Sequence, residues 1–148
     1  MDHAPIVYSR AMYEPLTIAM RWLHIASMAT LVGGIIFGRL VMMGALSGVS
    51  PETRDALGDR AAMLYRPLVI TAICGSILSG IYKYLSSGGH STTYQVLFGL
   101  KMLLVLHVYA AAILIVQPGN KRRTRQMSGA VVSGLIIVLI SAWLKTSF

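Results

Sequence analysis

The chain has 148 residues, of which 55% are hydrophobic and only 12% carry a charged side chain. A soluble domain contains about 25% charged residues, so this composition excludes an ordinary water-soluble fold and predicts a membrane protein. The net charge of +8 does not indicate nucleic-acid binding, because the lysines and arginines stand at the ends of apolar runs rather than along one stripe.

Four apolar segments are each long enough to cross a bilayer as a helix. We expect spans at about residues 17–46, 66–84, 95–116 and 126–144. Each is near the roughly 20 residues that a spanning helix needs, and lipid admits only elements that satisfy their own backbone hydrogen bonds. The first fifteen residues lack the apolar heart of a signal peptide, so we treat the first helix as retained. The prediction is a single all-α domain over residues 1–148, an integral membrane four-helix bundle.

The segments between the spans are short. Ser50 followed by Pro51 is typical of a helix start, and predicts a brief surface helix after the first span. Residues 86–93 read as a flexible turn, and residues 117–125 as a tight basic one. Small residues repeat at helical spacing, as in the G-x-x-x-G pair of Gly34 and Gly38, and predict close helix packing.

The basic residues are divided unevenly between the two ends of these spans. The end with the first and third connections carries Arg39, Arg54, Arg60, Arg66, Lys121, Arg122, Arg123 and Arg125. The opposite end carries Arg10, Arg21, Lys83 and Lys145. Cytoplasmic loops are enriched in Lys and Arg, so we expect both termini on the outer (periplasmic) side. The protein is then a multi-pass protein of a bacterial inner (cytoplasmic) membrane.

Three ionisable side chains fall inside the expected spans: His24, Lys101 and His107. Such groups are costly in lipid and are therefore functional candidates. His24 and Lys101 lie about 9 Å and about 7.5 Å outward of the midpoints of their helices, whereas His107 lies almost at the midplane. Lys101 and His107 are six residues apart, so they point about 120° apart around their helix. His24 and Lys101 are thus expected at one level, and His107 deeper.

His24 is the candidate ligand for a haem iron, because imidazole is a common axial ligand of haem proteins. The alternative is a neutral imidazole hydrogen-bonded to a backbone carbonyl. Arg21, one helical turn nearer the surface, could pair with a haem propionate. Lys101 could be the second ligand, a base, or a residue that extends to the head groups. A bis-histidine site with His107 would need the first helix to tilt or shift.

The stretch "WLHIASMATLVGGIIF" at residues 22–37 resembles the first helix of the copper-resistance-protein-D (CopD-like) membrane domain. The matching positions are Trp22, Leu23, His24, Val32, Gly33, Gly34 and Phe37. "TTYQVLFGLK" is similar to the third helix of that family, where a tyrosine precedes a lysine by seven residues, here Tyr94 and Lys101. "RPLVITAICGSILSG" is similar to its second helix.

The layout is also similar to that of HemJ, a protoporphyrinogen oxidase family. It too has L-H-I in its first helix, a glycine ten residues after the histidine, here Gly34, and a lysine in its third helix. HemJ proteins bind b-type haem, with that histidine and lysine implicated. The resemblance therefore implies haem b at His24 and Lys101.

Copper is the alternative metal. The chain opens "MDH", and a free terminal amine with a histidine third, here His3, forms a Cu(II) or Ni(II) site from backbone nitrogens and imidazole. The nine methionines could supply soft ligands for Cu(I).

Taken together, these patterns predict a b-type haem protein that exchanges electrons with quinone or porphyrin, as a homo-oligomer or as a subunit of a respiratory or redox complex. It would be either a HemJ-like oxidoreductase or a non-catalytic redox subunit. His24 would be the axial ligand, with Lys101 or His107 second, and Arg21 would hold a propionate. Two alternatives stay open: copper transport or resistance through His3 and His24, and a structural accessory subunit.

Overall fold

The computed structural model describes residues 4–86 and 92–147, and the side chains of residues 14–86 and 92–144. Within these ranges every regular element is helical, so the all-α prediction is confirmed. Four stretches are long and apolar enough to cross a membrane: Glu14–Gly48, Pro51–Leu85, Thr92–Ile115 and Arg123–Leu144. The predicted spans lie within these stretches, except that the third was predicted to end one residue later, at residue 116.

The first helical segment, residues 4–48, is not a uniform α-helix. It runs through α1 (Ala4–Met28), the π-helical turn η1 (Ala29–Gly33), α2 (Gly34–Phe37), a second π-helical turn η2 (Gly38–Met42), α3 (Met43–Ala45) and the 3-10 turn η3 (Leu46–Gly48). It begins well before residue 17, where the sequence predicted the span to start, and passes through Pro15. The wider π-helical turns follow directly after the part of the helix that carries His24.

The helix that contains the second span begins at Pro51, well before residue 66, where the sequence predicted the span to start. Ser50 caps α4 (Pro51–Leu85), because its Oγ accepts the N–H of Thr53 at 3.3 Å, and Pro51 occupies the first turn. The expected brief surface helix and the second span form one helix of 35 residues that continues through Pro67. Its buried positions recur every three or four residues on both sides of that proline: Gly58, Ala62, Val69, Ala72, Ser76 and Ser79. Packing along this face keeps the helix continuous.

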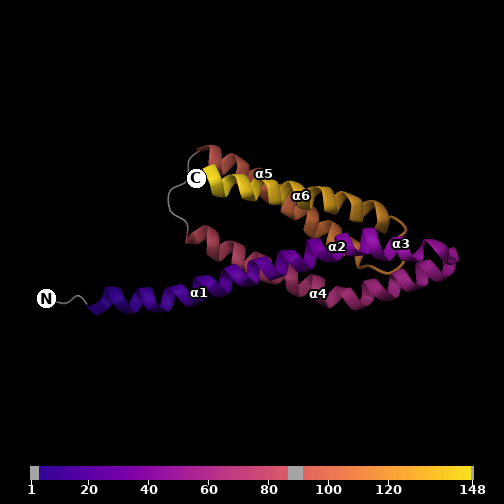
Figure 1. Ribbon diagram of the computed structural model, residues 1–148, viewed down its shortest axis with the longest axis horizontal. Helices are drawn as coiled ribbons and strands as arrows, with labels where there is room; N and C mark the ends of the chain where they lie inside the picture. The colour runs from indigo at the N-terminus through magenta and orange to yellow at the C-terminus, as the bar shows by residue number, and fades with distance from the viewer. Residues whose placement is uncertain (1–3, 87–91, 148) are drawn as a thin grey trace.

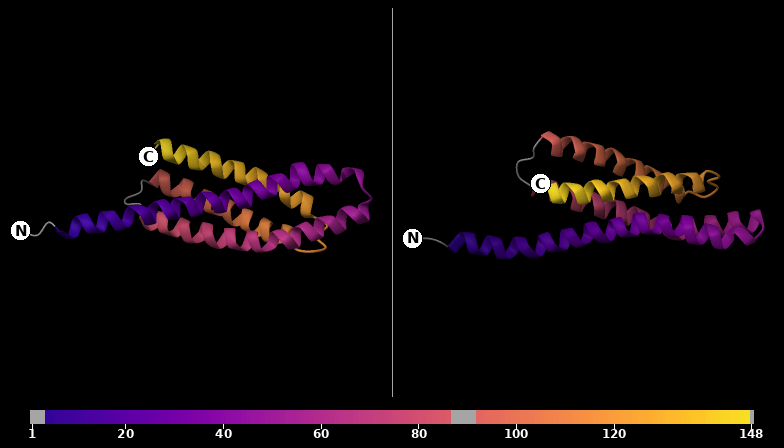
Figure 2. Two further views of the ribbon diagram at one scale, coloured as in Figure 1. Left: turned by 60° about the horizontal axis from the view of Figure 1, so that its bottom comes forward. Right: turned by 45° about the horizontal axis from the view of Figure 1, so that its top comes forward.

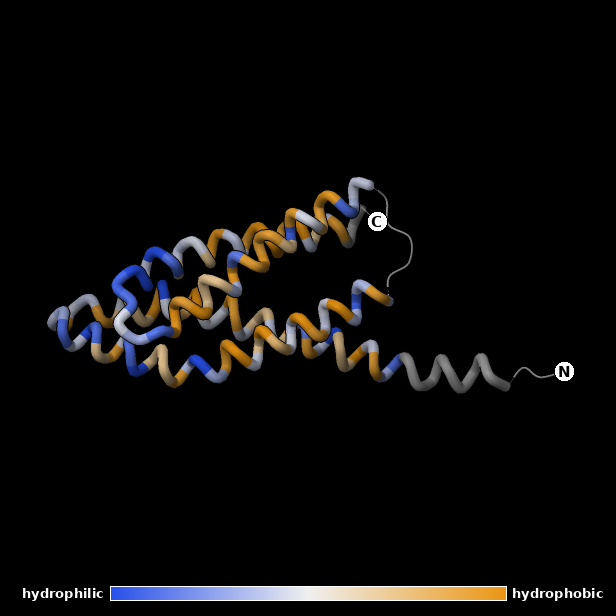
Figure 3. Tube along the Cα trace, turned by 180° about the vertical axis from the view of Figure 1, so that it is seen from behind, coloured by the Kyte–Doolittle hydropathy of each residue, from blue (hydrophilic) through white to orange (hydrophobic). Residues whose placement is uncertain are grey.

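The helices are arranged as two antiparallel pairs (Figure 1). The first helical segment lies along α4, and α5 (Thr92–Ile115) lies along α6 (Arg123–Ser147), as two further views also show (Figure 2). The pairs meet at the end that holds the connections after α3 and after α5. Toward the opposite end, where α4 ends and α5 begins, they splay apart (Figure 1). Hydrophilic residues gather around the connections, and apolar residues dominate the length of the helices (Figure 3).

The main core lies in the half of the bundle near these connections. Its buried residues are Leu31, Ile35, Val69, Ala72, Ala111, Ala112, Ile115, Val116, Met127 and Ala130. The exterior is apolar as well, with Trp22 73% exposed and Leu64 72% exposed. An apolar exterior over helices of this length is the surface that a bilayer would cover.

The predicted glycine pair packs the first helical segment against two different helices. A Cβ at Gly34 would overlap Tyr65 of α4, and one at Gly38 would lie 3.2 Å from Met127 Cε of α6. The hydroxyl of Tyr65 passes over Gly34 to donate a hydrogen bond to the carbonyl of Thr30 in η1. These small residues therefore set the separation of the helices, as the sequence predicted.

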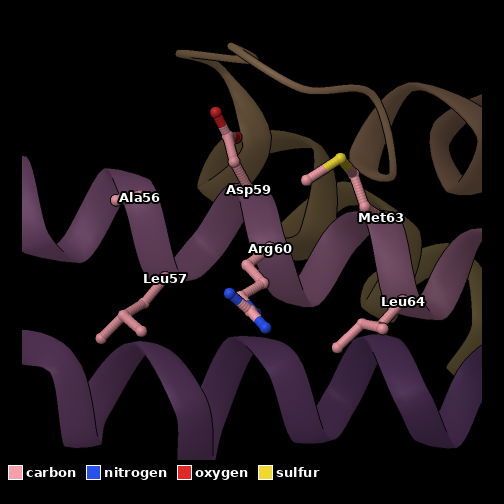
Figure 4. Close-up of a pocket in the computed structure, with 6 residues that line it drawn as sticks. All are labelled: Ala56, Leu57, Asp59, Arg60, Met63 and Leu64. Atoms are coloured by element: carbon pink, nitrogen blue, oxygen red, sulfur yellow. The ribbon is translucent and has the colours of Figure 1, made fainter.

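An arginine closes the connection end of the bundle. Arg123 is 7% exposed, and its guanidinium reaches Asp59 of α4 at 2.6 Å and the carbonyls of Ile115 and Gln117 at 3.0 Å each. Asp59 also accepts the N–H of Gly119, where the tight turn has a φ of +70° that favours glycine. Figure 4 shows Asp59 projecting from α4 on the side opposite Leu57, beside a surface hollow that both residues line.

Candidate functional site

His24 lies near the end of α1 and is held by a hydroxyl of α4. Its Nδ1 lies 3.0 Å from Ser79 Oγ, which in turn lies 2.7 Å from the carbonyl oxygen of Gly75. A serine hydroxyl has one hydrogen, and the Gly75 carbonyl can only accept. Ser79 Oγ also lies 3.2 Å from the carbonyl oxygen of Ser76, and that carbonyl is a hydrogen-bond partner of the His24 ring as well. In the tautomer with its proton on Nδ1, His24 donates to Ser79 and the lone pair of Nε2 is available to a ligand; in the other tautomer, Nδ1 accepts from Ser79.

A glycine lets α1 approach α4 closely enough for this contact. A Cβ at Gly75 would lie 2.6 Å from Ser27 Oγ and 3.1 Å from Leu23 Cδ1. Ser27 is itself buried, at 5% exposure. Gly75 thus has two roles at the site. Its carbonyl is a hydrogen-bond partner of Ser79, and its lack of a side chain allows α1 to approach α4 closely.

We expect Gly75→Ala to separate α1 from α4 and to lower the free energy of unfolding by about 1–3 kcal/mol, the cost of overpacking. Adding Ser27→Ala removes the closest clashing atom and should restore part of the loss. Unfolding in a mixture of mild detergent and SDS, followed by circular dichroism, measures both variants. Gly99→Ala in α5 is the control, because nothing lies within 4 Å of its added Cβ. Equal effects of Gly75→Ala and Gly99→Ala would contradict the close α1–α4 contact.

Two lysines gather near the imidazole at the splayed end of the bundle. The positive charges of Lys101 in α5 and of Lys83 in the last turn of α4 both act on the His24 ring. Lys101 is partly buried. Both lysines therefore lie within electrostatic range of His24, Lys101 from α5 and Lys83 from α4. Arg21 is exposed on α1, one turn from His24.

His107 lies elsewhere. It is exposed on α5, and its Nε2 is 3.6 Å from the position of a Cβ on Gly129 of α6. The two imidazoles pack against different helices, His24 against α4 and His107 against α6, so they do not form a bis-histidine pair. His3, the candidate copper ligand, lies outside the described residues.

Sequence reasoning missed a second hydroxyl contact on α4. Ser76 Oγ lies 2.9 Å from the Ile73 carbonyl oxygen and 2.7 Å from the hydroxyl of Tyr109. Two serines three residues apart on one face of α4 thus hold α1 through His24 and α5 through Tyr109. Their i, i+3 spacing within an apolar span was the available signal. The two contacts are neighbours, because Ser79 Oγ also lies 3.2 Å from the carbonyl oxygen of Ser76.

A haem would need few ligands from the chain. Within residues 4–86 and 92–147, as far as their side chains are described, no group of three or more His, Cys, Asp or Glu residues could hold a metal ion. A haem supplies four equatorial nitrogen ligands itself and needs only one or two side chains. A single oriented imidazole with a lysine on the facing helix is compatible with that requirement.

No protein-family model, curated protein or solved structure matches the chain. The fold and the site therefore define the class: an all-α bundle of four helices long and apolar enough to cross a membrane, with a hydrogen-bonded histidine among them.

Proposed function

We propose that the protein is an integral membrane protein of the CopD/HemJ-like kind that binds a b-type haem between α1 and α5 and exchanges electrons with quinone or porphyrin. One observation carries the proposal: Ser79 Oγ lies 3.0 Å from Nδ1 of His24, and in the tautomer that donates this hydrogen bond Nε2 presents a lone pair. Metal-bound histidines in proteins almost always donate their other ring N–H to a neighbouring group in this way. A bound haem would supply a one-electron redox centre.

Residues of three helices, α1, α4 and α5, would hold the haem. His24 of α1 would be the axial ligand, with its orientation fixed by Ser79 of α4. Lys101 of α5 would be the second ligand or a base facing the substrate. Arg21 and Lys83 would neutralise the two propionates, since both are cations at the same end of the bundle. The site would lie near the outer surface of a bacterial inner membrane, with the basic connections facing the cytoplasm.

The test is a visible spectrum of the protein purified in detergent after expression with ample haem, oxidised and then reduced with dithionite. We expect a Soret band with reduced α and β bands, which are lost in His24→Ala. Lys101→Ala should change the spin state if the lysine is a ligand. Ser79→Ala keeps His24 but removes the hydroxyl that is hydrogen-bonded to its Nδ1, and should weaken haem affinity by about 10- to 100-fold. His107→Ala is the matched control and should leave the spectrum unchanged.

Three outcomes would overturn the proposal. A spectrum lost in His107→Ala and kept in His24→Ala would make His107 the ligand in place of His24. A colourless protein that binds Cu(I) stoichiometrically would support the copper alternative. A colourless protein that binds neither metal, and in which His24→Ala only lowers stability, would make His24 part of a structural accessory subunit.

A further inference from the structure

A groove between α5 and α6 combines a basic end with apolar walls. Its volume is about 420 Å³, and its lining comes from α5, α6 and the connection between them. Arg122 and Arg125 stand at its outer end, His107 lines its inner part, and Ala110 and Leu114 form an apolar wall. The proposed haem site uses none of these residues.

The two arginines are available to a ligand. Both are exposed, and neither guanidinium has a hydrogen-bond or ion-pair partner among the side chains that the structure describes. Arg123, which lies between them in sequence, is instead buried against Asp59 and two backbone carbonyls. The groove therefore holds two cations that the fold leaves unneutralised.

The groove changes from charged to apolar with depth, and a histidine lies at its inner end. Arg125 and Gly129 are four residues apart on α6, which is about 6 Å along the helix. His107 is level with Gly129, because its Nε2 lies 3.6 Å from the position of a Cβ there. Leu114 and Ala110, both exposed, come after His107 on α5 and therefore line the groove between the histidine and the arginine end. A cationic end followed by an apolar wall suits a phosphate that carries an acyl chain.

We propose that this groove binds an anionic phospholipid of the surrounding bilayer. Arg122 and Arg125 hold its phosphate, and an acyl chain follows Leu114 and Ala110 inward toward His107. Basic pockets between spanning helices on the cytoplasmic side are typical sites for anionic head groups. The inference rests on the membrane insertion stated under the proposed function, but not on haem binding.

The arrangement of His107 argues against a second cofactor site at the inner end of the groove. Its Nε2 lies 3.6 Å from the position of a Cβ on Gly129, so this nitrogen faces the backbone of α6. A porphyrin ligated there would have to occupy space that α6 fills. An acyl chain that ends beside the ring needs far less room.

Native mass spectrometry in a non-ionic detergent tests the inference with phosphatidylglycerol and phosphatidylcholine of the same acyl chains. We expect the protein to retain phosphatidylglycerol preferentially. Arg122→Gln and Arg125→Gln should each weaken its retention by about fivefold, the effect of one basic residue near an anionic lipid surface. Lys121→Gln is the matched control: it makes the same change of charge in the same connection but does not line the groove. Ala110→Trp should also block binding, by filling the groove without changing its charge.

Equal losses in Lys121→Gln and Arg125→Gln would show a diffuse surface attraction and overturn the site, as would equal retention of the two lipids. Displacement of phosphatidylglycerol by equimolar inorganic phosphate would make free phosphate the ligand. A Soret band lost in His107→Ala would make the groove a cofactor site. The readout needs no haem, so a colourless protein leaves this test intact. A protein that stays soluble and monomeric without detergent would instead refute the membrane insertion itself.

Discussion

Replacing Gly34 with alanine is expected to lower the free energy of unfolding by about 2–4 kcal/mol, the cost of overpacking together with a lost hydrogen bond. The added Cβ would overlap the hydroxyl and the ring of Tyr65, which crosses from α4. Tyr65 cannot withdraw without giving up the hydrogen bond that it donates to the Thr30 carbonyl. The contact joins the first helical segment to α4 beside the buried Leu31 and Ile35, so the strain would reach the main core. Unfolding of the detergent-solubilised protein by SDS measures the loss.

The neighbouring glycine provides the control for this prediction. Nothing lies within 4 Å of a Cβ on Gly33, so Gly33→Ala should change stability by no more than about 0.5 kcal/mol. Tyr65→Phe alone should cost about 1 kcal/mol, the value of one hydrogen bond. In the double variant Gly34→Ala, Tyr65→Ala the clash disappears. Its loss of stability should therefore be smaller than the sum of the losses measured for Gly34→Ala alone and for Tyr65→Ala alone. Additive costs, or equal effects at Gly33 and Gly34, would show that Tyr65 does not pass over Gly34.

The sequence was enough to predict which segments are helical, but not where the helices bend or join. Long apolar runs predict four spans because a bilayer sets the length of a spanning element. The continuity of α4 through Pro67 could not be predicted from local pattern, since a proline inside a helix usually marks an end or a kink. Its buried face continues from Ala62 to Val69, and that packing depends on partners far away in sequence. The π-helical turns η1 and η2 carry no local signal of this kind.

For the site, the sequence could predict depth but not partners. The helical rise alone places His24 and Lys101 at one level, and the structure brings both to the splayed end of the bundle. The contact of His24 with Ser79 depends on how α1 is aligned along α4, which a close approach at Gly75 determines. Nothing in the local sequence around Ser79 specifies that alignment. The same limit applies to Tyr109 and its contact with Ser76.

Arg123 shows how the fold separates residues that sequence reasoning groups together. By composition it is one of eight basic residues at the connection end, all counted as signals of orientation. In the structure Arg122 and Arg125 are exposed, whereas Arg123 is buried among three acceptors from α4 and the end of α5. The difference arises because α6 begins at Arg123, and its first turn directs this side chain back over the tight turn.

Arg123→Met is therefore expected to destabilise the protein strongly, although it replaces a charge with an apolar side chain of similar length. The carbonyls of Ile115 and Gln117 would each lose a charged donor, at a cost of about 1–3 kcal/mol for each unsatisfied group. Gly58 confirms how closely the guanidinium is enclosed, since a Cβ there would lie 2.8 Å from Arg123 Nη1. Arg123→Lys should recover only part of the stability, because an ammonium group cannot reach three acceptors in the planar geometry of a guanidinium.

The controls for this prediction are Arg122→Met and Arg125→Met, which make the same chemical change on either side and should alter stability by no more than about 0.5 kcal/mol in lipid-free detergent. Asp59→Asn separates the ion pair from the carbonyl contacts. It removes the carboxylate charge, but the Ile115 and Gln117 carbonyls keep their donor, so it should cost less than Arg123→Met. If all three arginine variants unfold at the same SDS fraction, Arg123 is only another cation at the surface. If Asp59→Asn is as damaging as Arg123→Met, the ion pair rather than the carbonyl contacts holds the end of the bundle closed.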